Sequence, residues 1–346
     1  MRDHLARRRA GVAYSFMVSA LAFVAQPALA APPPNDVEHV VVAATGTKSS
    51  VFTVPQLATV VSGKEILDRA ARTTAEALQE EVGILVQETN LGGGSPFLRG
   101  QTGNRVLVLV DGIRLNNSTF RFGPNQYLNT IDPFTIDRIE IVRGPSSVLY
   151  GSDALGGVID VRTKRRLDFE KGFDLDAAAT TRFGSAAFEK TVRSDASANF
   201  GRFGLVGGVT FRNYDDLRSG AAKQPHTGYD ELDGDLRLQY RTDAGQEFAF
   251  TFQRVEQNRV PRTGAFENGD EYFFDPQRRS LYALEHTVDE LPWGFGTWRT
   301  TISFHDQLEV RRRLEASAMR TRREEDRART IGFTSDVDHH PTQGLV

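Results

Sequence analysis

The side chains that usually carry out catalysis are sparse in this sequence of 346 residues. Cysteine is absent, which removes thiol catalysis, thiolate metal sites, disulfides and lipoprotein acylation together. The sequence also lacks a His-Glu-x-x-His zinc motif, a phosphate-binding loop and the spacing of a nucleophile elbow. We therefore predict that the protein is not an enzyme and that it needs no cofactor.

Three groups of charged or histidine residues remain as candidate functional sites. For each of them a structural role is favoured over metal or ligand binding. The aspartates of residues 230–235 surround Gly234, but their spacing is not that of an EF-hand calcium loop, which favours a solvated strand end. His339-His340 is typical of a polar loop. The mixed run of residues 311–329 indicates a charged lumen or loop face, with lipopolysaccharide phosphates as an alternative contact. No metal site is predicted.

The overall composition indicates a β-protein with polar surroundings on both sides. Hydrophobic residues make up 39%, below the ~45–50% typical of globular chains, so each residue contributes less core. Glycine occurs 31 times, and 23 Phe stand against 8 Tyr and 2 Trp. The formal net charge of −3 gives no electrostatic reason to expect nucleic acid as a partner.

The N-terminal residues have the organisation of an export signal. A basic start is followed by an apolar run at residues 12–24 and by Ala28-Leu29-Ala30, which supplies small residues for a signal peptidase. A membrane anchor is disfavoured because the run is shorter than the ~20 residues a span needs. We predict a signal peptide at residues 1–30. No other stretch could cross a membrane as a helix, so a membrane location would require a closed β-barrel.

Residues 51–166 have the pattern of a small α+β domain. Apolar strands are expected near residues 57–61, 106–110, 139–142 and 157–162. Short helices are expected from Lys64, from the capping box Thr73–Glu76 and from Ser146. Asp111-Gly112 lies between apolar runs and predicts a tight turn, because both turn positions need positive φ. The prediction is a small mixed sheet flanked by short helices.

Residues 167–346 have the pattern of antiparallel strands joined by polar loops. Phe248, Phe250 and Phe252 alternate with small or polar residues, and Leu236 and Leu238 alternate with polar ones. Such alternation places one face in apolar surroundings and the other in a polar lumen. A soluble sandwich has the same periodicity, but the export signal and the preceding domain favour transmembrane β-barrel strands.

The segment from Phe97 to Ile159 resembles the plug domain of TonB-dependent outer-membrane receptors. The matching motifs are Phe97-Leu98-Arg99-Gly100, Val108–Gly112, Ile136–Pro145 and Ser147–Ile159. The resemblance covers roughly residues 36–166 and, more weakly, the later strands. It implies a location in the outer membrane of a Gram-negative bacterium, after export. It also implies energised uptake of a scarce nutrient, for which a ferric siderophore or similar iron complex is the leading candidate. The implied partners are the TonB energy transducer, the iron chelate and outer-membrane lipid.

The resemblance places an energy-coupling segment, the TonB box, near the mature N-terminus within residues 31–50. Its predicted residues are Glu38, His39, Val40, Val41, Val42, Ala43 and Ala44. A short β-forming segment of this kind can add itself as a strand to the sheet of another protein. An ordinary linker with a valine cluster is the alternative.

The resemblance also implies roles for residues of the predicted domain. Arg99 and Arg143 correspond to arginines that join the plug to glutamates of the barrel wall; two solvated arginines are the alternative. The loops at residues 88–96 and 116–126 would face the ligand, with residues 264–278 as a long external loop above them. The predicted ligand-binding residues are Arg121, Phe122, Asn125 and Gln126, which could instead pack on the barrel.

The length of the chain predicts an incomplete barrel. A plug of about 130 residues requires a wide barrel of about 22 strands, whereas residues 167–346 suffice for roughly eight to ten. The sequence also ends without the family's terminal aromatic residue. We expect a fragment of a longer receptor, with a truncated non-transporting product, a decoy or a pseudogene, as the alternative. The absence of histidine from residues 51–166 disfavours one route of haem binding, yet haem and cobalamin remain open as ligands.

Overall fold

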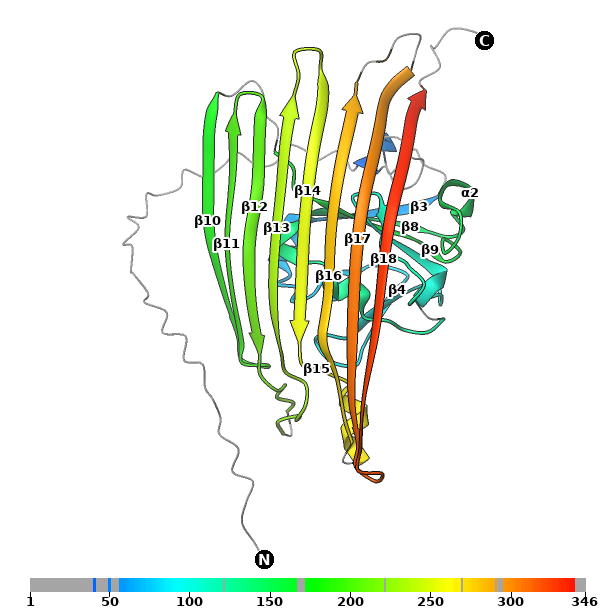
Figure 1. Cartoon of the computed structure of the whole chain (residues 1–346), viewed down its shortest axis with the longest axis vertical. Coiled ribbons are helices and arrows are strands. Elements are labelled where there is room, and N and C mark those ends of the chain that lie inside the picture. The colour runs from blue at the N-terminus through cyan, green and yellow to red at the C-terminus, as the bar shows by residue number, and fades with distance from the viewer. Residues whose placement is uncertain are drawn as a thin grey trace, which may run out of the picture. The chain divides into compact units, whose positions relative to one another are not determined.

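The computed structural model describes residues 40–41, 49–50, 56–120, 122–166, 172–220, 222–268, 270–289, 291 and 295–339. Residues 56–166 form a small α+β unit, here called the plug unit, and residues 173–339 form one antiparallel sheet, here called the barrel sheet (Figure 1). The predicted fold class is thereby confirmed. The predicted signal peptide lies outside the described residues. Within the described ranges, none of the helices combines the length and apolar character needed to cross a membrane.

The plug unit is built on a mixed five-stranded sheet, as predicted. Its strand order is β3-β8-β9-β6-β7, in which β6 and β9 run parallel and the other pairs are antiparallel. The strands are β3 (Leu57–Ser62), β8 (Ile136–Arg143), β9 (Gly157–Thr163), β6 (Val106–Val110) and β7 (Ile113–Arg114), with a separate hairpin of β4 (Ile84–Glu88) and β5 (Gly94–Leu98). The predicted turn joins β6 to β7 with positive φ at both Asp111 and Gly112.

The helices of the plug unit are short. α1 (Gly63–Asp68) begins with a complete capping box at Ser62–Glu65. The second helix, predicted from a capping box at Thr73, is present only as a 3-10 turn. Oγ1 of Thr73 accepts from the amide of Glu76 at 3.1 Å as a capping box requires, but the Glu76 carboxylate accepts from the amide and guanidinium of Arg72 instead of completing the box. The remaining short helices are α2 (Ser147–Tyr150), η1 (Glu76–Leu78), η2 (Gly103–Arg105), η3 (Tyr127–Thr130) and η4 (Pro133–Thr135).

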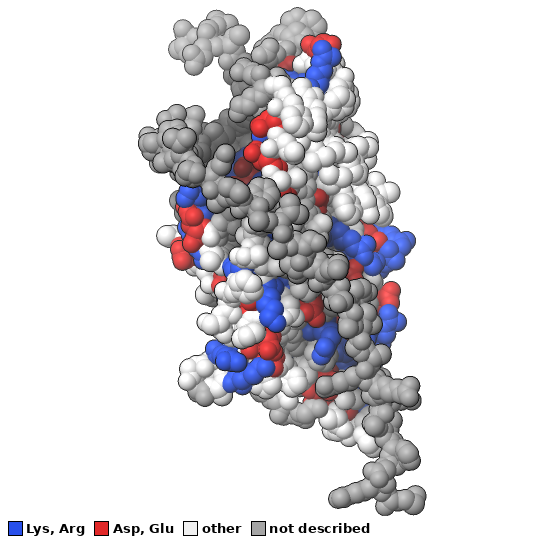
Figure 2. All heavy atoms as spheres, turned by 90° about the vertical axis from the view of Figure 1, so that its left-hand side faces the viewer, with Lys and Arg blue, Asp and Glu red and all other residues white. Residues whose placement is uncertain are grey.

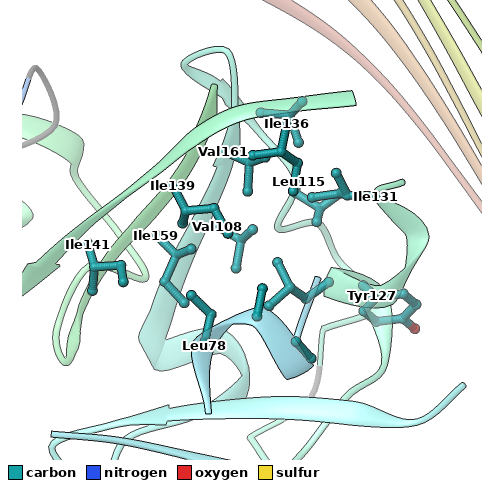
Figure 3. Packing of buried hydrophobic residues seen from close by; sticks show 14 of the residues in the cluster. Leu78, Val108, Leu115, Tyr127, Ile131, Ile136, Ile139, Ile141, Ile159 and Val161 are labelled. Atoms are coloured by element: carbon teal, nitrogen blue, oxygen red, sulfur yellow. The ribbon is translucent and has the colours of Figure 1, made fainter. Parts of the chain in front are cut away.

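One hydrophobic core fixes the loops of the plug unit in place. Leu78, Val108, Ile139 and Ile159 converge in it from η1 and from three strands of the sheet (Figure 3). Full burial of such a side chain contributes about 1.5–3 kcal/mol. Tyr127 lies at the edge of this cluster, and its hydroxyl points away from it (Figure 3). The same residue therefore belongs to the core and presents a polar group to the outside.

The barrel sheet consists of strands that follow one another in sequence order. Each pairs antiparallel with the next, and among the described residues β10 and β18 are the two ends of the sheet, so that no barrel closes (Figure 1). The long strands are β10 (Phe173–Gly184), β11 (Glu189–Phe200), β12 (Phe203–Tyr214), β13 (Tyr229–Arg241), β14 (Gln246–Asn258), β16 (Glu271–Val288), β17 (Phe295–Glu315) and β18 (Arg320–His339).

The two faces of the barrel sheet differ as period-two alternation predicts. On β14 the exposed Phe248 is followed by the buried Ala249, and buried Thr251 and Gln253 continue the inner face. Outward aromatic side chains meet across strands, for example Phe203 and Tyr240, whose ring centroids are 4.7 Å apart. Seen from the β10 side, basic and acidic side chains lie intermingled rather than in one patch (Figure 2).

The external loop predicted at residues 264–278 is shorter than expected. The 3-10 turn η5 occupies Thr263–Asn268, and β16 already begins at Glu271. A two-residue strand, β15 (Val260–Pro261), pairs with Phe273 and Phe274 of β16. Aromatic side chains favour the extended strand, which explains why half of the predicted loop belongs to the sheet.

Candidate functional site

A polar pocket lies between the plug loops and the connection from β14 to β16. Its volume is about 370 Å³, within the range of small-molecule sites. Hydrogen-bonding side chains of both units line it: Gln87, Thr89, Asn90, Asn125, Gln126 and Arg262. The Asn90 amide donates to the backbone oxygen of Pro261, which joins the plug loop to the wall of the pocket. The arrangement can hold a polar ligand by many weak donors and acceptors.

The glycine run of residues 92–94 allows the plug loop to approach the wall closely. A Cβ atom placed on Gly92 would lie 2.5 Å from Cγ1 of Val260, and one on Gly94 would lie 2.6 Å from Cβ of Ala75. Only glycine fits at such distances without a shift of the neighbouring side chain. The pocket wall therefore depends on the absence of side chains at these positions.

The structure brings together only some of the predicted ligand-binding residues. Asn125 and Gln126 line the pocket. Phe122 is exposed and lies 5.9 Å from the guanidinium of Arg105, measured to the ring centroid. Arg121 lies outside the described residues. Asn90 and Arg262 also line the pocket but were not predicted as ligand-binding residues. Asn90 lies in the glycine-rich loop that was expected to face the ligand. The position of Arg262 depends on the pairing of β15, which was not predicted.

Arg99 and Arg143 lie close together in the plug unit. A Cβ atom on Gly144 would be 3.1 Å from Nη1 of Arg99, and Arg143 donates to Oγ1 of Thr59 at 2.5 Å. Burial lowers the pKa of Arg143; the charge of Glu81 acts in the opposite direction, and the charge of Arg99 adds to the lowering. Within the part of the chain that the structure describes, neither arginine forms an ion pair with a carboxylate.

Asp132 joins the plug unit to the barrel sheet through buried charges. Its carboxylate accepts from Arg193 at 3.1 Å and from the hydroxyl of Thr210 at 2.6 Å, and it also pairs with Arg212. The amide of Phe134 donates to it at 3.0 Å, because Asp132 is the N-cap of η4. Asp132, Arg193 and Arg212 are each at most 3% exposed. This contact, here called the Asp132 anchor, was not foreseen from the sequence.

The barrel sheet supplies further carboxylates to the same arginines. Arg212 also pairs with Glu231 and Asp233, and Arg193 pairs with Asp235 at 3.0 Å. The prediction of a solvated strand end at residues 230–235 is therefore wrong. Asp233 and Asp235 lie on the inner face of β13, where Arg212 and Arg193 neutralise them. Asp230 is half-buried and accepts a hydrogen bond from Asn213 at 2.6 Å.

The pKa of Asp132 reflects this environment. Burial by itself raises the pKa of the carboxyl, but the charges of Arg212 and Arg193 and the hydroxyl of Thr210 overcome that effect and hold the pKa below its ordinary value. The carboxylate is thus ionised at neutral pH. Its charge is stabilised only as long as the plug unit stays against β11 and β12.

A second set of contacts joins the plug unit to β16 and β17. Arg165 forms an ion pair with Glu285 of β16 at 3.0 Å, and the contacts to β17 are hydrogen bonds. The Gln126 amide donates to Glu309 at 2.8 Å, and the Tyr127 hydroxyl donates to the same carboxylate at 3.1 Å. The Asn117 amide donates to Gln307, whose own amide donates to the Leu115 backbone oxygen at 3.3 Å. These side chains fix the outer loop of the plug unit against β17.

The predicted TonB box is described only in part. Val40 and Val41 form β1, which pairs antiparallel with Ser49 and Ser50 of β2. The other predicted residues, Glu38, His39, Val42, Ala43 and Ala44, lie outside the described residues. The two described valines are thus in the extended conformation that strand addition requires.

In the described residues the plug unit lies against an antiparallel sheet with a polar inner face. Comparison with known proteins identifies the smaller of these two units. Residues 50–158 match the family model of the TonB-dependent receptor plug domain. Residues 50–158 thus form a plug domain of the TonB-dependent receptor type, and the chain is similar to receptors of the outer membrane of Gram-negative bacteria.

Curated relatives are similar over part of their length. A hemin receptor of Yersinia pestis is 34% identical over 180 residues, which cover 48% of this chain and 26% of that protein. A vitamin B12 transporter, BtuB of Vibrio vulnificus, is 33% identical over 193 residues, covering 55% of this chain and 30% of the transporter. The chain thus spans less than a third of these curated relatives.

Solved structures share the fold at low sequence identity. A ferric enterobactin receptor mutant from Pseudomonas aeruginosa superposes with a TM-score of 0.63 at 17% identity, covering 85% of this chain and 47% of that structure. A copper transporter, OprC, gives a TM-score of 0.62 at 18% identity, covering 74% of this chain and 38% of the transporter. The likeness supports the plug-and-barrel architecture.

Proposed function

We propose that the receptor takes up a scarce iron complex, a ferric siderophore first, across the outer membrane with energy supplied by the TonB transducer. The polar pocket of about 370 Å³ carries this proposal, because carboxamides, hydroxyls and the guanidinium of Arg262 line it beside apolar side chains such as Val260 and Phe274. A metal chelate with many oxygen atoms at its surface is recognised by such donors. The extended β1, within the predicted TonB box, supports the coupling to TonB.

Hemin is a second candidate, and a specific observation favours it. His226 lies on the connection from β12 to β13, and its ring stacks on Phe266 of η5 with centroids 4.0 Å apart. The hydroxyl of Thr263, next to the pocket residue Arg262, donates to the backbone oxygen of His226 at 2.8 Å. An imidazole beside the pocket could ligate haem iron. The hemin receptors among the relatives agree with this candidate.

The two candidates predict different binding results for the purified receptor. We expect saturable binding of a ferric catecholate siderophore, and we expect this binding to be unaffected by His226→Ala. Equilibrium binding of ferric catecholate, hemin and cyanocobalamin should be measured side by side. Binding of hemin alone, abolished in His226→Ala, would replace the siderophore with haem. Binding of cyanocobalamin alone, or of none of the three, would contradict uptake of an iron complex.

A further inference from the structure

The outer face of the barrel sheet changes from apolar to cationic along β14, β16, β17 and β18. An apolar row crosses these strands at paired positions, formed by Phe252, Tyr282, Phe304 and Ile331. Most of the next outward positions are charged, in a first row with Arg254, Asp306 and Arg329 and a second row with Glu256, Arg278 and Arg327. These six residues, here called the arginine patch, comprise four cations and two carboxylates and so carry a surplus of positive charge.

The carboxylates of the arginine patch do not occupy all of its guanidinium groups. Asp306 accepts from Nε of Arg327 at 2.9 Å, and Nε of Arg329 lies 3.9 Å from the same carboxylate. Arg278 forms no ion pair within the described part of the chain. Each guanidinium has five N–H donors, so one carboxylate leaves most of the donors of these three arginines to solvent or to another anion. Phosphate offers several oxygen atoms to such donors.

The arginine patch is local and does not continue as a belt around the sheet. Opposite its first row, β13 and β12 carry Gly234 and Val209, and opposite its second row they carry Leu232 and Phe211. The apolar outer surface thus continues on β12 and β13 at the level where β14–β18 become charged. A difference of this kind between neighbouring strands indicates a site for a particular anion, since a general interfacial belt would include all strands.

The position of the arginine patch along the strands indicates the outer leaflet of the membrane. It lies toward the end where long connections join β12 to β13 and β14 to β16, whereas short turns join β11 to β12 and β13 to β14 at the opposite end. In outer-membrane barrels the longer connections are external. β17 and β18 also extend furthest at this end (Figure 1).

We propose that the arginine patch binds the phosphate groups of lipopolysaccharide in the outer leaflet. The acyl chains of the same molecule then pack on the apolar row that borders the patch. Arginine suits this role because its planar guanidinium forms two parallel hydrogen bonds with a phosphate. A free phosphate ion has the same charge chemistry but gains nothing from Phe304 or Ile331. The proposal rests on the outer-membrane location that the proposed function requires, and it adds a lipid partner.

Titration with lipid A tests the site directly. Native mass spectrometry of the detergent-solubilised receptor measures the binding of bisphosphoryl lipid A. The variant Arg327→Gln/Arg329→Gln removes two cations of the patch. The matched control Arg313→Gln/Arg322→Gln removes two cations that pair across the same two strands on their inner face. Circular dichroism checks that each variant keeps the sheet, and Arg254→Gln/Arg278→Gln repeats the test if the first variant is not recovered.

We expect the Kd for bisphosphoryl lipid A to rise at least tenfold in Arg327→Gln/Arg329→Gln and to stay within twofold of wild type in the control. Lipid A without its phosphates should bind wild type as weakly as the intact lipid binds the patch variant. Equal affinity of wild type and patch variant, or an equal loss in both variants, would overturn the proposal. An excess of inorganic phosphate should leave the complex intact, and complete displacement by it would overturn the assignment to a lipid.

Lipid A binding separates this proposal from the proposed function, because it needs neither an iron complex nor TonB. A receptor that binds lipid A through the arginine patch but binds no iron complex supports the lipid site and contradicts the uptake of iron. A receptor that binds the ferric catecholate but binds lipid A equally well without the patch arginines does the reverse.

Discussion

Asp132 is a buried carboxylate whose cationic partners belong to another structural unit. Two guanidinium groups and one hydroxyl from β11 and β12 surround it, and the wall carboxylates Glu231 and Asp233 share one of the guanidinium groups. Removal of Asp132 therefore leaves no arginine without a carboxylate. The expected loss of stability is therefore that of hydrogen bonds to charged groups, and not the larger cost of a buried charge without a partner.

The substitution Asp132→Asn should weaken the attachment of the plug unit by about 1–3 kcal/mol at neutral pH. The native pKa is lowered, so the stabilisation is present above the unfolded pKa of ~3.9 and is lost as pH falls through the native pKa. The difference between wild type and variant should consequently shrink on acidification below about pH 4. Urea midpoints of plug unfolding at several pH values measure it.

Asp137→Asn provides the matched control for this prediction. Its side chain is 53% exposed and pairs with Arg138 at 3.0 Å, so a change below about 0.5 kcal/mol is expected. Equal effects of both substitutions at neutral pH would contradict the anchoring role of Asp132.

Gly92 shapes the pocket because it has no side chain. The substitution Gly92→Ala should cost about 1–3 kcal/mol by overpacking, because its Cβ would lie 2.5 Å from the buried Val260. Gly123→Ala, at another pocket glycine with nothing within 4 Å of its Cβ, should be nearly neutral. Hydrogen exchange of the loop at residues 88–96 reports the difference. The double variant Gly92→Ala/Val260→Ala should restore protection, and failure to do so would show that space is not the cause.

At the level of elements, much of the architecture follows from local sequence signals. The Asp111-Gly112 turn, the buried β6 and the outward Phe248 and Phe250 were all predicted, because turn chemistry and period-two alternation act over a few residues. The helix expected at Thr73 is limited to a 3-10 turn, because the carboxylate of Glu76 bonds to Arg72 and does not complete the capping box.

The candidate site was predictable only in part, for a related reason. The loop residues Asn125 and Gln126 could be named from the resemblance. The Asp132 anchor could not, because it joins residues 61 and 80 positions apart in the chain, and the charges of Arg193 and Arg212 have no local pattern. An alternating strand shows which side chains face inward, but not which plug residue they meet.

The extended strand β1 allows the predicted coupling segment to be tested separately. Val41→Pro should abolish uptake and leave ligand binding intact, since proline removes a backbone donor from the strand that would be added to TonB. Val41→Thr keeps the donor and the strand preference and should transport normally. Both variants should be compared by uptake and by equilibrium binding. Normal uptake by Val41→Pro would remove these residues from the coupling segment.

For the whole molecule, the plug unit is fastened to the sheet by many separate contacts, which include buried ion pairs at β11 and β12 and hydrogen bonds at β17. Arg99 and Arg143 form no ion pair with a carboxylate of the described residues.

The most direct test of energised uptake is the accumulation of iron in iron-starved cells that express the receptor, supplied with a radiolabelled ferric catecholate. The account predicts accumulation well above that of receptor-free cells when TonB is present. It also predicts only surface-bound label, removable by excess unlabelled siderophore, when TonB is absent. Equal accumulation with and without TonB, or none above receptor-free cells, would contradict it.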